Sequence, residues 1–450
     1  MSKTIRIKKG LDIRLQGEAE KVLAQADPAK VIAIKPTDFH GLTPKLLVAQ
    51  GDQVKAGTPL FRDKYNERVV FTSPVSGEVA EVVRGEKRRI LEVRVLADAE
   101  PIFEEHGGGD PATMDRDAIL EQLLKTGCWP FIRQRPFDVI ADPKGLPKAI
   151  LVPAFNTAPL AADLDFVMRN QGADFQDGLN ALAKLTSGRV HLNVSAQTTG
   201  REFLDAKQVQ VNTFEGPHPA GNIGVQLHHL DPLNKGEVVW FCYPQDVAMI
   251  GRTLRSGHFD GIRTVAITGS EAKVRRYVRT RIGTPVAHLV GEVGPDVRVI
   301  SGDPLSGDNV GKDGYLGAYH SQITILPEGD APKFFLTDGW LSPGFDKFSA
   351  SRSFPSWIMS GKRYAPDTNQ NGEERAFVVT GQYEKVFPFD IYPVHLIKAV
   401  LVNDIELMEN LGILEVAPED FALCEYVCTS KIASQRIIRE GLDTYKKETT

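Results

Sequence analysis

The feature that most limits how this chain can fold is a change in the spacing of its apolar residues near position 115. Before it, short runs rich in Val, Ile and Leu are separated by turns containing Gly, Pro or Asp, a pattern typical of β-strands. These runs are VIAIKP, KLLVAQ, PLFRDK, RVVFTSP, GEVAEVV and ILEVRVL. After it, apolar residues three or four positions apart alternate with short apolar runs, which predicts helices alternating with buried strands. We therefore predict an α/β multidomain chain, and its 450 residues suffice for several domains of ~150 residues.

Residues 1–100 are predicted to form a small barrel-like β sandwich. AQGDQVKAGTPLF brackets one strand with Gly-Asp and Ala-Gly turns, and TSPVSGEVAEVV follows with a corner at Pro74 and Gly77. This order of turns resembles the lipoyl and biotinyl carrier domains, which present a modified lysine at a hairpin tip. The corresponding position is Asn66, with Lys64 two residues earlier. Because an amide is not acylated as an amine is, we expect the carrier scaffold without its modification.

Residues 101–257 are predicted to form a Rossmann-like α/β domain. DRDAILEQLLKTG places its apolar residues on one face of a helix that ends at Gly127, and DFQDGLNALAKLTSG predicts a second helix. KAILVPAF and RVHLNVS are short apolar runs typical of buried parallel strands. No G-x-G-x-x-G follows any of these strands, so the domain is predicted to lack a cofactor motif.

Two further regions complete the predicted organisation. Residues 258–330 read as strand (GIRTVAITGS), helix (KVRRYVRTRIGTPVAHLV) and strand (DVRVISGDPLSGD), which is compatible with a β-grasp module of the soluble ligand-binding type. Residues 331–450 form a C-terminal region that is mostly helical after position 393, with a helix start at Pro418.

Composition narrows the functional classes. With 53 Lys and Arg against 58 Asp and Glu, the net charge of −5 offers no field for a phosphate backbone, so no nucleic acid partner is expected. Four cysteines are too few for a disulfide framework. The longest charge-free run of the central part, residues 149–162, is shorter than the ~20 apolar residues of a spanning helix and is interrupted by prolines. We expect a soluble chain without a transmembrane segment, held at any membrane by another subunit.

Few residues have the spacing of a catalytic or metal site. Cys424 and Cys428 stand four positions apart on a predicted helix, where packing in a helix seam is favoured over metal binding because a structural zinc or a cluster needs four ligands. His228 and His229 would point to opposite faces of a strand and so would not share a metal. No Ser/His/Asp set, H-E-x-x-H or P-loop occurs, and we predict no catalytic, cofactor-binding or metal residue.

Two loops are unusual in composition. In GPHPAG, prolines and glycines around His218 fix a rigid loop, which can present backbone N–H groups to a ligand or serve only as a structural corner. KFSASRSF, residues 347–354, carries two phenylalanines and two basic residues, and an interface and a folded-back loop are both open.

Seven segments occur in the order of a known family: KKGLDI, VVFTSPVSGEV with VVRGEKR, FEGPHPAG, RVISG, GYLGAYH, KFSASRSF and ALCEYVC. Over nearly its whole length the chain resembles the A-subunit family of the sodium-translocating NADH:quinone oxidoreductases. The resemblance implies a peripheral subunit on the cytoplasmic face of the bacterial inner membrane, within a six-subunit complex that includes integral membrane subunits. That complex couples electron transfer from NADH to quinone with sodium export, and its flavins, iron–sulfur cluster and NADH site are expected in other subunits.

More distantly, the layout resembles the C-subunit of the Rnf complex and the flavin-bearing subunit of complex I. Where those relatives have a Gly-rich flavin loop, this chain has GCWPFIRQRPF, whose bulky side chains oppose close backbone approach to a phosphate. NTAPLAAD and FCYPQDV likewise replace two other flavin elements, and the cluster cysteines shrink to CEYVC. We therefore expect no cofactor in this chain, with quinone as a substrate that it can contact.

Two alternatives stay open: a flavin-binding NADH dehydrogenase-type subunit, and a non-catalytic adaptor built on the carrier-like scaffold. For the favoured A-subunit family, two sites are predicted. Gly216, Pro217 and His218 are expected to line a quinone pocket. The second site is a partner interface, for which the candidates are Lys347, Phe348, Arg352 and Phe354.

Overall fold

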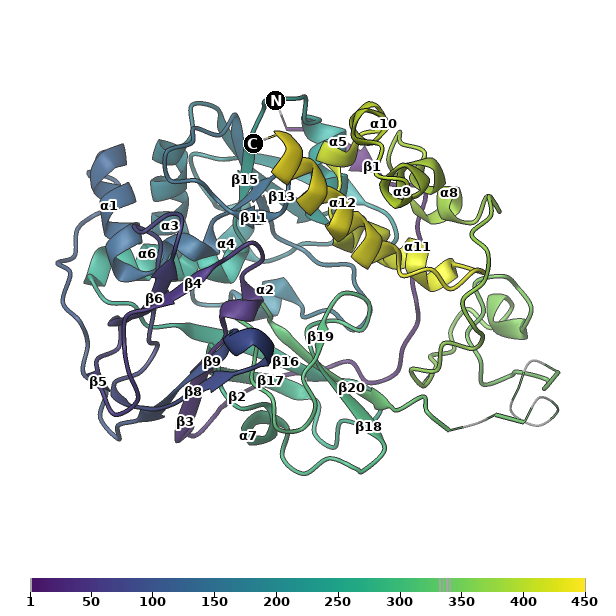
Figure 1. Ribbon diagram of the computed structural model, residues 1–450, viewed down its shortest axis with the longest axis horizontal. Helices are drawn as coiled ribbons and strands as arrows, with labels where there is room; N and C mark the ends of the chain where they lie inside the picture. The colour runs from purple at the N-terminus through teal and green to yellow at the C-terminus, as the bar shows by residue number, and fades with distance from the viewer. Residues whose placement is uncertain (1, 332, 335, 337–338, 340, 450) are drawn as a thin grey trace.

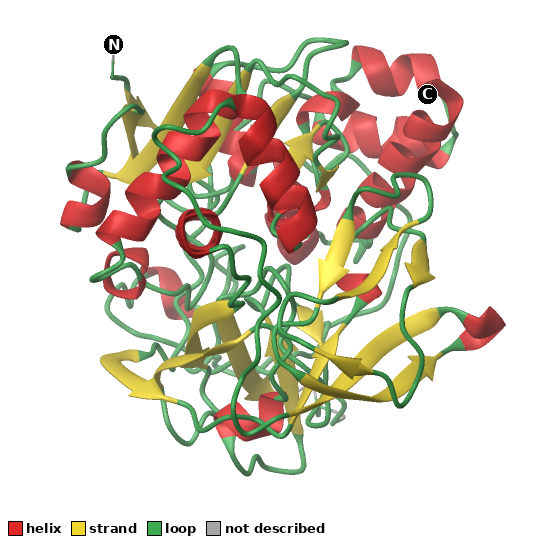
Figure 2. Cartoon of the chain, turned by 90° about the vertical axis from the view of Figure 1, so that its left-hand side faces the viewer, coloured by secondary structure: helices red, strands yellow, loops and turns green. Residues whose placement is uncertain are grey.

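The computed structural model describes residues 2–331, 333–334, 336, 339 and 341–449. Four β-sheets are arranged in three units, and a cluster of helices near the C-terminus packs beside them (Figures 1 and 2). Within this described part of the chain, no helix is long and apolar enough to cross a membrane.

The first unit is an antiparallel β sandwich, as the alternating runs predicted. Its larger sheet holds β3 (Val31–Ile34), β9 (Ile90–Ala97), β8 (Gly77–Arg84) and β5 (Gln53–Val54) in that order. Its smaller sheet holds β4 (Pro44–Leu46), β6 (Pro59–Asp63) and β7 (Val70–Thr72). Leu60, Phe61, Val79, Val93 and Val95 are fully buried between them. Asn66 lies in the hairpin between β6 and β7, where its backbone carbonyl accepts the N–H of Val69 at 2.9 Å.

The second unit is built on a seven-stranded sheet. Its order is β1 (Thr4–Arg6), β14 (Gln210–Glu215), β13 (Arg189–Ser195), β12 (Ala149–Pro153), β15 (Val239–Phe241), β10 (Arg133–Arg135) and β11 (Val139–Ile140). The first five strands are parallel, and β10 and β11 run antiparallel at one edge. The central strands β12 and β15 are wholly apolar, as expected for strands that are covered on both faces, whereas β1, β13 and β14 also carry polar residues.

Helices cover both faces of this sheet. One face is covered by α1 (Arg116–Thr126), α3 (Gly172–Leu185) and α6 (Pro244–Ser256). Their apolar side chains pack with alternate residues of β12 in one apolar core, called the first core here. On the other lies α5 (Ile223–Leu230), whose Ile223 and Leu227 pack on Leu151 and Phe241. Helix α1 begins at the N-cap Asp115 and ends at Gly127, whose φ of 76° is left-handed, so the helix end predicted from sequence is confirmed. The shorter helices between the strands are α2 (Leu164–Val167) and α4 (Arg201–Leu204).

The third unit is a six-stranded mixed sheet. The order is β19 (Asp308–Asn309), β18 (Val297–Ser301), β20 (Gln322–Pro327), β16 (Ile262–Thr268), β17 (Arg276–Arg281) and β2 (Glu20–Gln25). The single helix predicted over KVRRYVRTRIGTPVAHLV is wrong, because its first half is strand β17 and only α7 (Val286–Val290) is helical. The cause is visible in the burial of β17: Tyr277 and Val278 are buried where it pairs with β16, so tertiary pairing overrides the local pattern.

The C-terminal unit is helical, as predicted, but its helices are shorter. It holds α8 (Tyr383–Val386), α9 (Pro393–Leu401), α10 (Ile405–Asn410), α11 (Ala422–Val427) and α12 (Ser434–Thr449). A one-turn 3-10 helix, Pro418–Phe421, precedes α11, which confirms a helix start at Pro418. The chain leaves the helical conformation at Cys428, so no continuous helix joins α11 to α12.

The first 25 residues do not belong to the first unit, although residues 1–100 were predicted as one domain. Strand β1 pairs in parallel with β14 of the second unit, and β2 pairs in parallel with β17 of the third. Between them, Ile7, Ile13 and Leu15 are buried in a second core with the C-terminal helices. The N-terminal segment therefore ties the other three units together.

Candidate functional site

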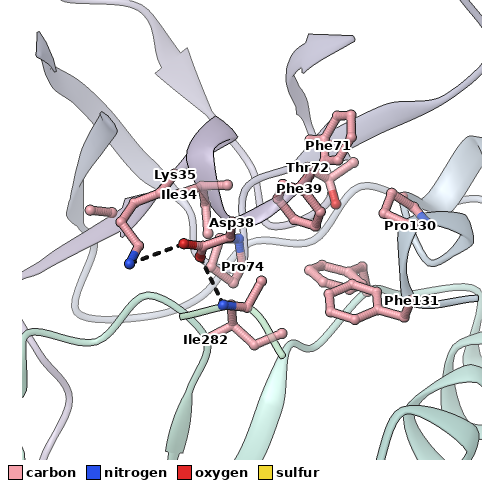
Figure 3. A pocket seen from close by; sticks show the side chains of 14 residues that line it. Ile34, Lys35, Asp38, Phe39, Phe71, Thr72, Pro74, Pro130, Phe131 and Ile282 are labelled. Carbon is pink, nitrogen blue, oxygen red and sulfur yellow. Dashed lines mark hydrogen bonds and ion pairs between the residues drawn. The ribbon is translucent and has the colours of Figure 1, made fainter. Parts of the chain in front are cut away.

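A small pocket, in which the space open to the centre of a water-sized sphere is about 20 Å³, lies where the first three units meet. Residues of the first unit form one wall, the segment after α1 forms another, and the third unit closes it (Figure 3). Its lining residues are Ala33, Ile34, Lys35, Asp38, Phe39, Phe71, Thr72, Pro74, Gly127, Pro130, Phe131, Phe259, Ile282 and Ala318. Because ligand sites favour junctions between domains, this pocket is the principal candidate site.

The walls of the pocket are mainly aromatic. Phe39 and Phe71 lie with ring centroids 4.5 Å apart, and Phe131 and Phe259 are stacked at 6.2 Å. Tyr319, behind the wall, meets Phe39 edge-on at 5.5 Å and donates its hydroxyl hydrogen to the carbonyl oxygen of Pro130 at 2.6 Å. Such walls favour a planar, largely apolar ligand.

One corner of the pocket is charged. Lys35 Nζ lies 3.0 Å from Asp38 Oδ1, and the backbone N–H of Ala318 donates to Asp38 Oδ2 at 2.8 Å (Figure 3). Burial raises the pKa of Asp38 despite the neighbouring ammonium. Lys35 Nζ also donates to the carbonyl oxygen of Tyr315 at 3.3 Å. The corner thus offers an ammonium donor and a carboxyl group beside an apolar cavity, which suits a ligand with a carbonyl oxygen at its rim.

The segment that replaces a glycine-rich loop fills space with side chains. Trp129 is fully buried, donates its indole N–H to the carbonyl oxygen of Ala141 at 2.8 Å and meets Trp240 edge-on at 5.4 Å. Arg133, on strand β10, lies opposite Phe241 at the carboxyl end of β15. Bulky side chains therefore fill the space at this segment, as the sequence predicted.

A network of ionic groups lies beside the edge strands β10 and β11 of this sheet. Arg135, with a fully buried side chain, donates to Glu419 Oε1 at 2.7 Å and to Asp420 Oδ2 at 3.4 Å. Arg133 donates to Asp138 Oδ1 at 2.6 Å, and Arg439 lies 3.4 Å from the other oxygen of Asp138. Three cations therefore face three carboxylates.

The environments of these carboxyl groups differ. Burial raises the pKa of Glu419 to about 7, and Arg135 only partly opposes this. The pKa of Asp138 is lowered because Arg133, Arg135 and Arg439 together outweigh its burial. In open α/β sheets ligands bind outside the carboxyl ends of the strands. In this chain β10 runs antiparallel to β15, so Arg133 lies opposite the carboxyl end of β15 and Arg135 opposite its amino end.

His218, the predicted quinone-pocket residue, is buried. Its Nδ1 lies 3.1 Å from the hydroxyl oxygen of Thr157, and its backbone N–H donates to Asp12 Oδ1 at 2.8 Å. Burial lowers the pKa of His218 to about 4, so the ring is neutral at pH 7. Gly216 has a φ of 142°, and a Cβ there would lie 2.3 Å from the carbonyl oxygen of Ile7. The loop is rigid, as expected, and Pro217 packs close to Gly10.

The four predicted interface residues lie in a loop that folds back on itself and still reaches the surface. Lys347 Nζ donates to Ser342 Oγ at 2.7 Å and lies 5.1 Å from the ring of Phe354. Phe348 is half-buried against Tyr364. Arg352 is exposed, with its guanidinium 5.6 Å from the ring of Trp357. The folded-back loop left open by the sequence is thus met in part, and the interface stays a prediction.

The remaining candidates from the sequence are the two cysteines of the C-terminal unit and the histidine pair. Cys424 and Cys428 are buried, and burial raises the pKa of the Cys424 thiol. Contrary to the strand considered for them, His228 and His229 lie on α5; His228 Nδ1 is 3.0 Å from Glu415 and His229 Nδ1 is 2.9 Å from the carbonyl oxygen of Val225. Among the described residues, no group of three or more His, Cys, Asp or Glu is placed to hold a metal ion.

Sequence reasoning missed the pocket and the ionic network. Lys35 and Asp38 sit in an ordinary-looking KPTD turn, and their partner Ala318 is far along the chain. The GCWPFIRQRPF segment was recognised as unusual, but the partners of its arginines, Glu419 and Asp420, were read only as a helix start. Contacts across such separations leave no local signal.

Three family models match the chain. They are the NqrA N-terminal barrel-sandwich hybrid domain at residues 5–98, the NqrA second alpha/beta domain at 114–259 and the NQRA C-terminal domain at 264–312. The chain is 38% identical to the A-subunit of the Na(+)-translocating NADH-quinone reductase of Rhodopirellula baltica, covering 98% of each chain. This chain belongs to the NqrA family. Further NqrA relatives are those of Marinomonas sp., 37% identical over 98% of this chain and 99% of that protein, and Pseudomonas aeruginosa, 38% identical over 99% and 100%.

A solved structure also resembles this member of the NqrA family weakly. It is an NAD+-reducing [NiFe]-hydrogenase in the air-oxidized state, with a TM-score of 0.37, 10% identity and coverage of 78% of this chain and 68% of that one.

Proposed function

We propose that this NqrA-family chain is a cofactor-free, peripheral member of the six-subunit Na(+)-translocating NADH-quinone reductase, on the cytoplasmic face of the bacterial inner membrane. Its partners are the other subunits, some of them integral to the membrane, and its loop 347–354 faces them. The observation that supports the cofactor-free role is the segment that stands in place of a glycine-rich loop, where the fully buried side chain of Trp129 fills the space against Trp240.

A spectrum and a metal analysis test the cofactor-free role. We expect the chain, purified from its native host, to be colourless, to contain no stoichiometric iron and to oxidise no NADH by itself, because it has neither a dinucleotide fingerprint nor a hydride acceptor. Stoichiometric flavin, or NADH–quinone turnover by the pure chain, would favour the flavin-binding alternative. Co-purification of integral membrane flavoproteins with the tagged chain tests the assembly, and their absence would favour the adaptor alternative.

Within the complex, we propose that the aromatic pocket opens to receive the ring of the quinone, because its volume of about 20 Å³ is close to that of one water-sized sphere. Phe39, Phe71 and Phe131 offer faces for a planar ring, and Lys35 offers a donor to a quinone carbonyl oxygen. A reduced quinone gains negative charge on its oxygens, which the ammonium of Lys35 stabilises, while Asp38 is a carboxyl group close enough to exchange a proton. The rigid loop at Gly216, Pro217 and His218 is the second candidate.

Paired variants distinguish the two candidate pockets. Lys35→Gln and His218→Ala are each checked by thermal melt and titrated with a short-chain ubiquinone, and the KM for quinone is measured in the assembled complex. We expect Lys35→Gln to weaken quinone binding about tenfold, the loss of one hydrogen bond to a charged group of ~1.5 kcal/mol, and His218→Ala to leave it unchanged. The reverse result would assign the ring to His218, and no effect from either variant would remove quinone from this chain.

A further inference from the structure

Residues 341–363, called the tip here, lie at the right-hand edge of the molecule as drawn in Figure 1. Leu341, Phe345, Trp357 and Ile358 are each at least 50% exposed. Single exposed apolar residues are normal on a surface, but four within 18 residues of one loop are a concentration that needs a reason.

The tip is also basic on an acidic chain. It carries Lys347, Arg352, Lys362 and Arg363 against the single carboxylate of Asp346, whereas the whole chain has a net charge of −5. Arg363 pairs with Glu18 at 2.5 Å. Within the described part of the chain, no ion pair joins Arg352 or Lys362 to a carboxylate. The charges of Arg352 and Lys362 are therefore available to an anionic partner outside the chain.

The tip is held in one conformation by the N-terminal segment. Arg14 donates to the carbonyl oxygens of Ser356 at 2.6 Å and Met359 at 2.8 Å, and its guanidinium lies between the rings of Phe348 and Tyr364, at 5.7 and 5.9 Å. The backbone N–H of Tyr364 donates to the carbonyl oxygen of Arg14 at 2.8 Å. Because this ordering is complete before any partner arrives, docking costs little additional conformational entropy.

We propose that the tip docks on the surface of an anionic phospholipid bilayer. Arg352 and Lys362 bind the phosphate headgroups, while Trp357 and Ile358 enter the boundary between headgroups and acyl chains, where tryptophan is favoured. The proposal rests on the proposed function in that the protein sits beside a membrane. It adds that the lipid itself, rather than only a protein neighbour, is a binding partner.

Charge complementarity decides between a lipid surface and an uncharged protein surface. An anionic bilayer repels a chain of net charge −5 as a whole, so its contact favours a surface on which basic residues outnumber acidic ones, as they do by four to one in the tip. The tip joins that basic charge to exposed apolar side chains, which is the combination that binds membrane interfaces. The docking would orient the molecule as well as hold it.

Vesicle flotation of the full-length chain tests the proposal. The probes are vesicles of phosphatidylcholine alone and of phosphatidylcholine with phosphatidylglycerol. We expect binding to the anionic vesicles that weakens as salt is added, and little binding to the neutral ones. Arg352→Gln with Lys362→Gln should weaken binding ~30-fold, since each basic residue near an anionic surface contributes about fivefold. Trp357→Ser with Ile358→Ser should abolish it.

The matched control is Tyr392→Ser with Val402→Ser, two exposed apolar residues on either side of α9 that are outside the tip. It should bind vesicles like the unmodified chain, and thermal melts confirm that all variants are folded. Equal binding to both kinds of vesicle, an equal loss in the control, or no binding of the unmodified chain would overturn the proposal. If the chain binds no vesicles but still co-purifies with membrane subunits, the proposed function stands and a protein occupies the tip. If it binds vesicles but no subunits, the assembly is what fails.

Discussion

Arg135 brings a full positive charge into a part of the protein from which water is excluded. Its side chain has no exposed surface. Its charge is compensated by Glu419 and Asp420, which lie almost 300 residues further along the chain. A buried pair of this kind stabilises little in net terms, because both charges lose their hydration. Removing one partner is different, because the charge that remains is buried without compensation.

Arg135→Met is therefore expected to lower the free energy of unfolding by about 3–5 kcal/mol, measured by urea denaturation. Adding Asp420→Asn to that variant should recover part of the loss, because it removes a carboxylate left without its cation. The matched control is Arg436→Met, whose exposed pair with Glu440 at 3.2 Å should change stability by less than about 1 kcal/mol. Equal effects from Arg135→Met and the control would contradict a buried network.

Glu419 gives the network a pH dependence. Its folded-state pKa is raised to about 7 from the ordinary 4.5, so the folded protein holds this proton more tightly than the unfolded chain does. The resulting stability is fully present below about pH 4.5 and is lost as the pH rises toward 7. Relative to Glu419→Gln, the unmodified protein should thus lose on the order of 1–2 kcal/mol between pH 5 and pH 7. Parallel stability curves for the two proteins would show that Glu419 titrates normally.

Local signals explain which single residues were predictable. The end of α1 at Gly127 follows from a left-handed conformation that glycine adopts without strain. The prediction that the carrier scaffold is unmodified rests on the chemistry of Asn66 alone. The Lys35–Asp38 corner was not predictable, because the burial that raises the pKa of Asp38 comes from residues of other units, such as Phe131 and Ala318.

At the scale of elements, helices α3 and α6 cross closely because each has a glycine at the contact. A Cβ on Gly178 would lie 2.0 Å from the carbonyl oxygen of Val247, and one on Gly251 would lie 2.0 Å from that of Asp174. Neither position has a positive φ, so close approach, and not backbone conformation, requires glycine there.

Gly178→Ala is expected to destabilise the protein by about 1–3 kcal/mol, because two backbones must separate to admit one methyl group. Gly172→Ala is the matched control: it lies at the first position of the same helix and would meet only Glu202 Cγ at an ordinary 3.5 Å. The control should be neutral or stabilising by up to ~1 kcal/mol, since alanine favours the helix. Thermal melts measure both, and a neutral Gly178→Ala would show that the crossing is loosely packed.

Elements with one buried face were predicted best. The alternating runs of the first hundred residues became β3, β4, β6, β7, β8 and β9. Strand β17 was missed because it owes its conformation to pairing with β16 and β2, which no window of its own sequence reports. The break at Cys428 was missed for a similar reason: apolar spacing continues across it, and the turn is fixed by packing of both flanking helices in the second core.

At the scale of the whole molecule, the N-terminal segment decides the stability of the C-terminal unit. Ile7, Ile13 and Leu15 contribute to the second core, and Arg14 fixes the tip. This arrangement was not predictable, because residues 1–100 read as one β domain and nothing in the first 25 assigns them to other sheets.

Deleting residues 2–16 should therefore make residues 376–449 sensitive to protease while the β sandwich between β3 and β9 stays resistant. Limited proteolysis with mass spectrometry of the fragments measures this. The deletion removes three buried side chains, each worth about 1.5–3 kcal/mol of burial, so the melting temperature should fall as well. A deletion of residues 99–101, three exposed residues between β9 and α1, serves as the control for shortening the chain. Unchanged cleavage sites after the N-terminal deletion would show that the C-terminal unit does not depend on the N-terminal segment for its stability.

The second core also sets a timetable for synthesis. Ile7 is translated more than 400 residues before Ile438 and Leu442, which belong to the same core. At about 5–20 residues per second, the cell takes roughly 20–90 seconds to make the intervening chain. During that time the apolar residues of the N-terminal segment have no native place to go, so they are exposed to chaperones and to neighbouring nascent chains. The C-terminal unit thus completes the second core, to which the N-terminal segment contributes much earlier in synthesis.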